Sequence, residues 1–230
     1  MTKEQLIKQL NYLDVATNID LLEKLQQDTL ETNKLFNLTA IKDEEKFREL
    51  MVLDSLYPLG LVDFDDMKVI DIGTGAGYPG LPLAICSKGE FTLLDSTKKK
   101  IDHINEFALA NNISNVRGVN ARAEEYAKSH REEYDIAIAR AVSSLNILLE
   151  LIIPLLKVGG AFIAMKGSKG FEEIKDSEKA LKELGAEVVE IQEIELPESK
   201  EKRINILIIK TKETKQKYPR EYKDIVNKPL

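Results

Sequence analysis

The spacing of apolar residues changes near residue 66 and divides the chain into two parts. Before that point, apolar residues recur every three or four positions, which predicts amphipathic helices. A capping box of Thr2 and Gln5 starts the first helix, Asn18 or Asp20 caps the second, and the third begins near Asp43. We interpret their apolar stripes as packing surfaces rather than ligand sites.

From residue 67 onwards, short apolar runs alternate with helical stretches, which is typical of strands buried on both faces of a parallel sheet. Only a polar link, residues 197–202, separates the last two strands, so we predict that they pair as an antiparallel hairpin. The predicted strands are residues 67–72, 90–95, 115–119, 134–139, 160–165, 187–194 and 203–210.

The predicted helices of this second part lie between its strands. One follows Thr97, another follows Ser143 or Ser144, and a third runs from about Gly170 to a C-terminal Gly185. We therefore expect three regions: an N-terminal helical extension (1–66), an α/β domain (67–212) and a basic C-terminal tail (213–230).

The first predicted strand ends in an acidic residue and opens into the glycine-rich turn of Val69–Gly80. Glycine lets a backbone approach a ligand closely, because it has no Cβ and tolerates positive φ. Residues 75–80 fit the dinucleotide motif GxGxxG, with Asp95 at a suitable distance for a ribose hydroxyl. Residues 71–77 instead fit the loop that binds S-adenosylmethionine. A turn that only joins strand to helix is the third interpretation.

Two observations favour S-adenosylmethionine. The carboxylate of Asp71 would repel a pyrophosphate but attract the ammonium and sulfonium groups of the methyl donor. A reversed strand at the end of the sheet is typical of methyltransferases, whereas an NAD-binding domain more usually ends in parallel strands. The predicted fold is therefore α/β, Rossmann-like and of the class I methyltransferase type. Its seven-stranded sheet is mostly parallel with one antiparallel strand, and an N-terminal helical extension precedes it.

Composition narrows the setting without choosing the function. The 230 residues suit one sizeable domain with an appendage. Cys86 is the single cysteine and there are two histidines, which excludes a disulfide framework and gives no basis for a transition-metal site. The polar N-terminus lacks a signal-peptide core and no apolar run is long enough to cross a bilayer, so we expect a cytoplasmic protein without membrane contact.

The net charge of −6 argues against broad, non-specific binding of nucleic acid. Basic residues nevertheless outnumber acidic ones in residues 210–230. The commoner interpretation of such a run is a solvated tail, and a local phosphate-binding patch is the alternative.

Ligands of open α/β sheets lie beyond the carboxyl ends of the strands, and this places the other contacts. Asp95 ends the second strand, where it can accept hydrogen bonds from both ribose hydroxyls. Residues 121–125 follow the third strand, beside the expected adenine. Arg140 ends the fourth strand, where an acceptor would meet the methyl group, and Lys166 ends the fifth in the same crevice.

These motifs closely resemble the glucose-inhibited division protein B family, also called RsmG, which comprises bacterial small-subunit ribosomal RNA guanine-N7 methyltransferases. The resemblance spans nearly the whole chain, and the extended loop Gly-Tyr-Pro-Gly-Leu-Pro is its most specific part. Two departures are Met51, where the family usually has histidine, and a less basic segment at 221–226. The matching segments are 36–39, 53–56, 71–83, 93–96, 122–125, 139–141, 144–146, 165–167, 217–220 and 227–230.

The resemblance implies that S-adenosylmethionine contacts Gly73, Tyr78, Ala123, Glu124 and Arg140. The geometric argument adds four residues to the predicted donor site: Asp71, Gly75, Gly77 and Asp95.

The implied substrate is a specific guanine of 16S ribosomal RNA, free or in the small subunit, and we expect the chain to act as a monomer. Guanine N7 has a lone pair and no proton to lose, so positioning by Arg140 and Lys166 suffices without a general base. Lys169 and Arg203 are further candidates for substrate contact, and Lys98–Lys100 and the tail for phosphates.

Two other functions stay open: a methyltransferase of another substrate, and a non-catalytic regulator that binds S-adenosylmethionine. The intact acidic, glycine and Arg140 positions argue against the regulator.

Overall fold

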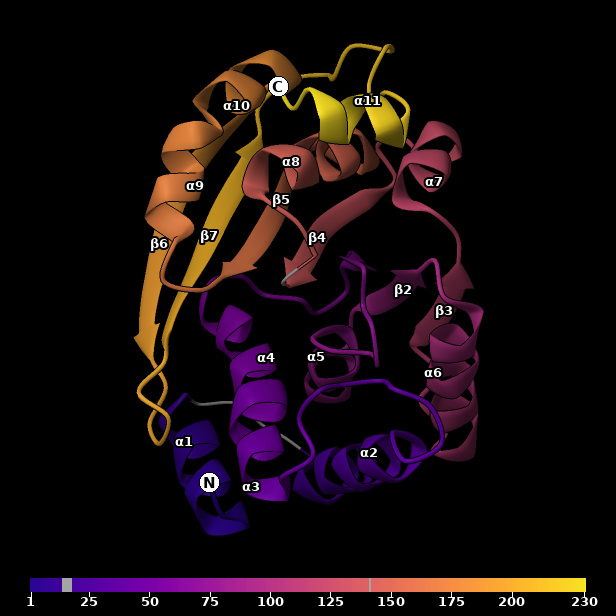
Figure 1. Cartoon of the computed structure of the whole chain (residues 1–230), viewed down its shortest axis with the longest axis vertical. Coiled ribbons are helices and arrows are strands. Elements are labelled where there is room, and N and C mark those ends of the chain that lie inside the picture. Colours follow the sequence, from indigo (N-terminus) through magenta and orange to yellow (C-terminus); the bar gives the residue numbers. More distant parts are fainter. Residues whose placement is uncertain (14–17, 141) are drawn as a thin grey trace.

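Within the residues that the computed structural model describes (1–13, 18–140 and 142–230), seven strands form one twisted sheet between two layers of helices (Figure 1). The strands are β1 (Lys68–Ile72), β2 (Glu90–Asp95), β3 (Val116–Asn120), β4 (Tyr134–Arg140), β5 (Leu156–Lys166), β6 (Ala186–Glu195) and β7 (Lys202–Lys210). Their order is β3-β2-β1-β4-β5-β7-β6, and β7 runs antiparallel to both of its neighbours. The predicted fold, with its terminal hairpin and one reversed strand, is confirmed.

The helices cover both faces of the sheet. They are α1 (Lys3–Tyr12), α2 (Ile19–Thr32), α3 (Glu44–Phe47), the π-helix η1 (Arg48–Leu53), α4 (Asp54–Leu56), the 3-10 helix η2 (Tyr57–Gly60), α5 (Gly80–Cys86), α6 (Lys98–Ala110), α7 (Ala123–Ser129), α8 (Leu145–Ile152), the 3-10 helix η3 (Ile153–Leu155), α9 (Gly170–Asp176), α10 (Glu178–Leu184) and α11 (Tyr222–Asn227). No described helix is long and apolar enough to cross a membrane.

Alternation along the strands creates two apolar cores. Val69 of β1 belongs to the core shared with α1–α6, whereas its neighbour Ile70 belongs to the core shared with α7, α8, α10 and α11. Successive side chains of a strand point to opposite faces, so both faces of the sheet are buried. Asp71 therefore lies on the same face as Val69, beneath the glycine-rich turn.

Three local predictions differ from the structure. The helix predicted from Gly170 to Gly185 is two helices, because Ser177 separates α9 from α10 and its hydroxyl donates to the Glu173 carbonyl. The third N-terminal helix contains the π-helical turn η1. Finally, β5 begins at Leu156 rather than at residue 160.

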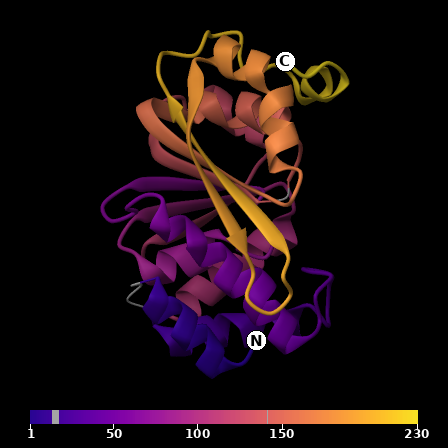
Figure 2. The same ribbon diagram turned by 90° about the vertical axis from the view of Figure 1, so that its left-hand side faces the viewer.

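The N-terminal helices also hold the far end of the sheet. The β6–β7 hairpin reaches past the sheet and its tip lies beside these helices (Figure 2). Glu49 of η1 is buried there and accepts hydrogen bonds from the backbone N–H groups of Glu198 (2.6 Å) and Ser199 (3.1 Å). Leu196 of the same tip is fully buried in the N-terminal core. The extension is therefore a structural layer of the sheet.

The segment predicted as a basic tail packs against α8. Ile225 of α11 is fully buried. Glu150 of α8, also fully buried, accepts from the Arg220 side chain and from its backbone N–H (2.9 Å). These contacts anchor residues 218–227 on the domain, so this part of the tail is packed against α8 rather than free in solvent.

Candidate functional site

The glycine-rich turn connects β1 to α5 at the carboxyl edge of the sheet. Gly73, Gly75 and Gly77 have φ values of +73°, +60° and +95°. Residues with a Cβ rarely adopt such backbone conformations. A Cβ on Gly73 would also lie 2.6 Å from the Val142 side chain. The turn thus depends on glycine for its conformation and, at Gly73, for space.

Asp71 supports this turn from below. Its Oδ2 accepts hydrogen bonds from the Thr74 hydroxyl (2.7 Å) and the Gly80 N–H (2.9 Å), at the two ends of the turn. The side chain is fully buried, and burial raises the pKa of Asp71 from 3.8 to about 6, against the opposing effect of those hydrogen bonds. It does not line the cavity described next, so the structure gives Asp71 a loop-holding position.

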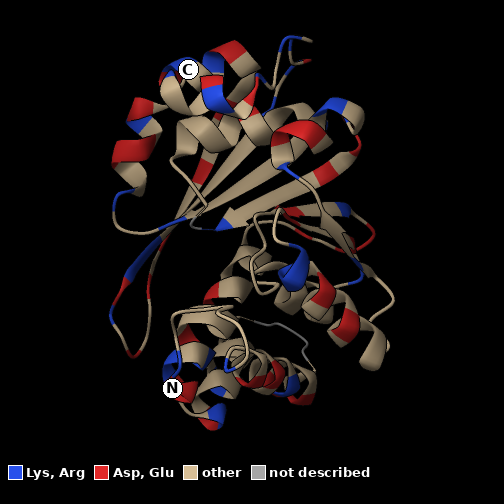
Figure 3. Cartoon of the chain, turned by 45° about the vertical axis from the view of Figure 1, so that its right-hand side comes forward, with Lys and Arg blue, Asp and Glu red and all other residues tan. Residues whose placement is uncertain are grey.

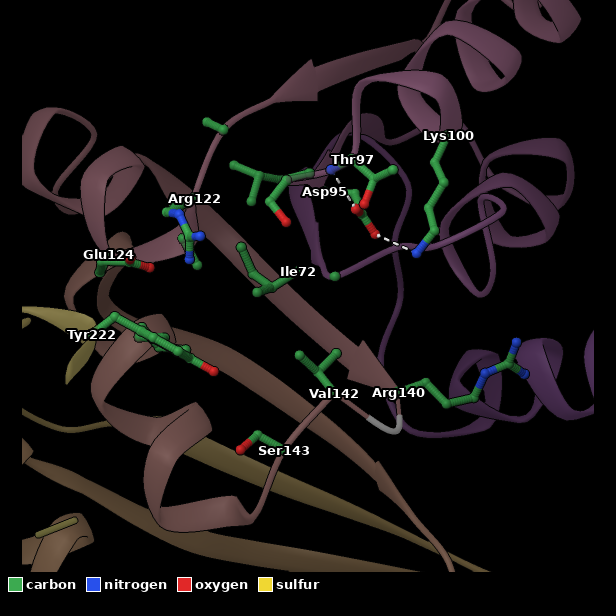
Figure 4. Close-up of a pocket in the computed structure, with 16 residues that line it drawn as sticks. Ile72, Asp95, Thr97, Lys100, Arg122, Glu124, Arg140, Val142, Ser143 and Tyr222 are labelled. Carbon is green, nitrogen blue, oxygen red and sulfur yellow. Dashed lines mark hydrogen bonds and ion pairs between the residues drawn. The ribbon is translucent and has the colours of Figure 1, made fainter. Parts of the chain in front are cut away.

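A cavity of about 360 Å³ opens beside the turn, beyond the carboxyl ends of β1, β2 and β4 (Figure 4). It combines apolar walls from Ile72 and Leu94 with polar groups from the loops after β2 and β3. Five of the predicted donor-site residues line it: Gly73, Asp95, Ala123, Glu124 and Arg140. We call this space the donor cavity.

Asp95 and Glu124 are the two buried acids of the donor cavity. Asp95 accepts from the Gly75 N–H at 3.1 Å and the Thr97 N–H at 2.8 Å, and Lys100 Nζ lies 3.4 Å from it. These contacts hold the Asp95 carboxylate at the cavity edge, as Figure 4 shows. Glu124 stands in the first turn of α7, where the helix dipole favours an acid.

Three predicted donor-site residues besides Asp71 lie outside the cavity lining. Gly75 and Gly77 shape the turn instead. Tyr78 is buried in the N-terminal core, where its ring packs edge-on against Phe47 with centroids 5.4 Å apart. Its hydroxyl lies 3.3 Å from that of Thr29, and burial raises the pKa of Tyr78 above its usual value. The Tyr78 side chain thus fixes the turn on the helical layer.

Arg140 stands between the donor cavity and a second one. Its side chain extends away from the donor cavity towards η1 (Figure 4). There its Nη1 donates to the carbonyls of Leu50 and Met51 (3.4 Å each) and to the Ser55 hydroxyl (3.2 Å). Such π-helical turns often occur at functional sites. Here two carbonyls of the turn accept from an arginine at the end of β4.

The second cavity has a volume of about 560 Å³ and lies between η1, the end of β5 and the base of β7. It shares Arg140, Val142 and Ser143 with the donor cavity. Lys166 lines it, with Nζ 2.6 Å from the Ser143 carbonyl and 2.8 Å from Glu173 Oε2. We call it the acceptor cavity, after the prediction that Arg140 and Lys166 contact the acceptor.

Asp54 and Tyr222 line these cavities but were not predicted as site residues. Asp54 of α4 lies in the acceptor cavity, 3.1 Å from Arg203 Nε and 3.4 Å from Arg140 Nη1. Tyr222 of α11 lines the donor cavity beside Glu124 (Figure 4). The sequence offered one indication of Asp54: it is an acidic residue next to the apolar positions of a predicted helix, within the family-matching segment 53–56. No sequence pattern indicated Tyr222, which reaches the donor cavity only because the tail packs on the domain.

The basic residues predicted for RNA contact occupy different places. Arg203 lines the acceptor cavity, whereas Lys169 and Lys98 are exposed. Lys98 pairs with Asp102 one helical turn away, and Lys100 pairs with Asp95. In the view of Figure 3, acidic and basic residues are interspersed over the outer helices.

The histidines do not belong to either cavity. His103 is buried on α6 with its Nδ1 3.5 Å from Asp28 Oδ2, and burial lowers the pKa of His103. His130 stacks on Tyr126 at 3.7 Å between ring centroids. Over the described ranges, no group of three or more acids, histidines or cysteines is arranged to hold a metal ion.

Comparison with protein families gives a match over most of the chain. The family model for GidB, described as rRNA small subunit methyltransferase G, matches residues 18–215. A ribosomal RNA small subunit methyltransferase G from Fusobacterium nucleatum is 46% identical over 206 residues, which cover 87% of each chain. One from Caldicellulosiruptor bescii is 43% identical over 237 residues, covering 99% of this chain and 100% of that protein.

Solved structures share the fold at low sequence identity. TYW2 of M. jannaschii, in complex with AdoMet, has a TM-score of 0.55 and 16% identity, covering 69% of this chain and 73% of that chain. The [4+2]-cyclase SpnF has a TM-score of 0.54 and 14% identity, covering 69% of this chain and 80% of that chain. At this identity the likeness concerns the fold alone.

Proposed function

Because the chain belongs to the ribosomal RNA small subunit methyltransferase G family, we propose that its donor cavity holds S-adenosylmethionine while its acceptor cavity receives a guanine of 16S ribosomal RNA. The protein is an S-adenosylmethionine-dependent ribosomal RNA methyltransferase. One observation carries the assignment of the two cavities: they share the wall of Arg140, Val142 and Ser143. A donor and an acceptor can therefore meet without either leaving its own cavity.

The residues of the donor cavity suit S-adenosylmethionine. Asp95 ends β2, where its carboxylate can accept from the ribose hydroxyls. Ala123 and Tyr222 supply flat or apolar surface near Glu124, which suits the adenine. Gly73 lines the cavity with backbone alone, and a Cβ there would lie 2.6 Å from the Val142 side chain. Asp71 would act on the donor through the turn, since it fixes the N–H group of Gly80 and the Thr74 hydroxyl.

The chemistry needs alignment rather than proton transfer. When bound, S-adenosylmethionine supplies a methyl group on a positively charged sulfur. Guanine N7 carries a lone pair and no proton, so the protein must hold the base in line with that methyl group and exclude water, which can supply much of the rate. Arg140 and Lys166 both line the acceptor cavity, where Lys166 donates to the Ser143 carbonyl, and are proposed to position the base.

The three predicted regions of the chain would divide this work. Residues 67–212 carry the donor turn and the strand ends. Residues 1–66 close the acceptor cavity through η1 and α4, and residues 213–230 add Tyr222 to the donor cavity. We propose that the substrate is the guanine within the small subunit or its RNA, and that a monomer of this protein acts on it in the cytoplasm.

A labelling experiment tests the function. The purified protein is incubated with S-adenosylmethionine labelled in its methyl group and with undermethylated small subunits, free 16S RNA or a metabolite extract. We expect label in RNA, recovered as N7-methylguanine after digestion. Label only in protein or metabolites would contradict the ribosomal function, and no transfer to any acceptor would favour a donor-binding regulator.

A further inference from the structure

Asp54 is a buried acid of the acceptor cavity with only half of its carboxylate engaged. Its side chain is 3% exposed. Oδ2 accepts from Arg203 Nε at 3.1 Å and lies 3.4 Å from Arg140 Nη1. Oδ1 is buried and has no hydrogen-bond partner among the residues that the structure describes. Buried polar atoms are nearly always partnered, so an orphan acceptor beside a cavity calls for an explanation.

The two arginines give the Asp54 carboxylate a fixed position. They approach from different elements, Arg140 from β4 and Arg203 from β7, and both line the same cavity. Their charges offset that of the buried carboxylate. A ligand that supplies further N–H donors, and no acceptor in the same place, would complete the hydrogen bonding of Asp54.

We propose that Asp54 selects the acceptor base by accepting hydrogen bonds from N1–H and N2–H of guanine. This rests on the proposed function and names a specificity residue for it. Guanine presents these two donors side by side on its Watson–Crick edge, whereas adenine has an acceptor at N1 and no amino group at C2. In the purine ring N7 lies across from this edge. A base with N7 at the wall shared with the donor cavity thus turns its Watson–Crick edge into the acceptor cavity.

Arg140 controls access to Asp54. Its contacts on this side are numerous but long, from 3.2 Å to Ser55 Oγ to 3.5 Å to Met51 Sδ, and charge-assisted hydrogen bonds are normally shorter. Arg140 also lines the donor cavity. The incoming guanine therefore replaces Arg140 at Asp54, and Arg140 turns towards the shared wall. The pair Asp54–Arg203 remains as the fixed half of the site.

The test removes the 2-amino group of the base on one side of the proposed contact and the carboxylate of Asp54 on the other. Small subunits are reconstituted with 16S RNA that is ligated to carry either guanosine or inosine at the methylated position; inosine lacks only the 2-amino group. The methylation rate constant kcat/KM is measured for both substrates with the wild type and with Asp54→Asn. We expect the wild type to prefer guanosine by about tenfold, as for one hydrogen bond to a charged acceptor. In Asp54→Asn this preference should fall towards one.

Glu201→Gln is the matched control, since Glu201 also lines the acceptor cavity and pairs with Arg203 but is about half exposed. It removes the same charge and should keep the preference for guanosine. If Asp54→Asn lowered kcat/KM equally for guanosine and inosine, the proposal would be overturned. Asp54 would then only hold Arg140 and Arg203 in position. Equal use of guanosine and inosine by the wild type would overturn it without any variant. If the wild type methylates neither substrate, the proposed function itself fails.

Discussion

Single residues of the glycine-rich turn act on the donor cavity from different sides. Gly73 lines the cavity and has no room for a side chain, because its Cβ would lie 2.6 Å from the Val142 side chain. Asp71 acts from beneath, where it ties Thr74 to Gly80. Changing Gly73 should therefore affect donor binding, whereas changing Asp71 should affect stability.

Gly73→Ala should weaken S-adenosylmethionine binding at least tenfold, measured by isothermal titration calorimetry. The added Cβ meets Val142 at 2.6 Å and the residue must keep φ near +73°, which typically costs about 1–3 kcal/mol for a residue with a Cβ. Gly159→Ala is the control, because Gly159 has φ +87° but open space around it and lies outside the cavity. It should lose stability and keep donor affinity; equal loss of affinity in both variants would contradict the role of Gly73.

Asp71→Asn should change how stability depends on pH. The pKa of Asp71 is raised to about 6 from 3.8, so the folded protein binds this proton more tightly than the unfolded chain. Stability from Asp71 is thus greatest below pH 4 and is lost as the pH rises through 6. The difference in unfolding free energy, wild type minus variant, should fall by roughly 2–3 kcal/mol between pH 4 and 7, as measured by urea unfolding. A difference that is constant over this range would contradict the buried, ionising carboxylate.

Among the elements, the strands could be predicted because each is a short apolar run in the sequence. The apolar runs of β2 and β7 are bounded by polar residues, so predicted and observed limits agree within a residue. The break at Ser177 was not predictable, since apolar periodicity continues through it from α9 to α10. Five of the predicted donor-site residues line one cavity at the carboxyl edge of the sheet, whereas Tyr78 is directed into the core by packing on Phe47, which lies far away in sequence.

The helix α11 shows how a late element can complete an early site. Tyr222 lies in the donor cavity although more than a hundred residues separate it from the glycine-rich turn. No motif in the sequence connects the two. The connection depends on Arg220 and Glu150, which fix the tail on α8.

Tyr222→Ala should therefore weaken S-adenosylmethionine binding about five- to tenfold, because aromatic contact with a base contributes about 1–3 kcal/mol and Tyr222 is partly exposed. Tyr222→Phe should bind nearly as the wild type does. Val226→Ala serves as the control on the same helix, since Val226 is similarly exposed but does not line the cavity. Donor affinity that is the same in the Tyr222→Ala and Val226→Ala variants would rule out the contact.

The whole molecule is held together across the acceptor cavity. The N-terminal layer meets the β6–β7 hairpin through Glu49, and the two arginines of Asp54 come from β4 and β7. Helical extension, sheet and hairpin thus enclose one space. The relative position of these parts decides the shape of the acceptor cavity, which no local pattern in the sequence describes.

Glu49→Ala should lower the free energy of unfolding by about 1–3 kcal/mol, because it removes the buried carboxylate that accepts from the backbone N–H groups of Glu198 and Ser199. Hydrogen exchange should increase first at the hairpin tip. Gln5→Ala removes an exposed contact between α1 and the same hairpin tip, at Glu198, and should cost less than about 1 kcal/mol. If the two variants were equally stable, Glu49 would not be what holds the hairpin.

We expect this chain to methylate a guanine of 16S RNA at N7. The most direct measurement maps N7-methylguanine in 16S RNA from cells with the gene, without it, and with the deletion complemented by the wild type or by Gly73→Ala. We predict that one guanine loses its methyl group in the deletion strain, and that the wild type restores it fully while Gly73→Ala restores it poorly. A methylation map that is identical with and without the gene would contradict this function.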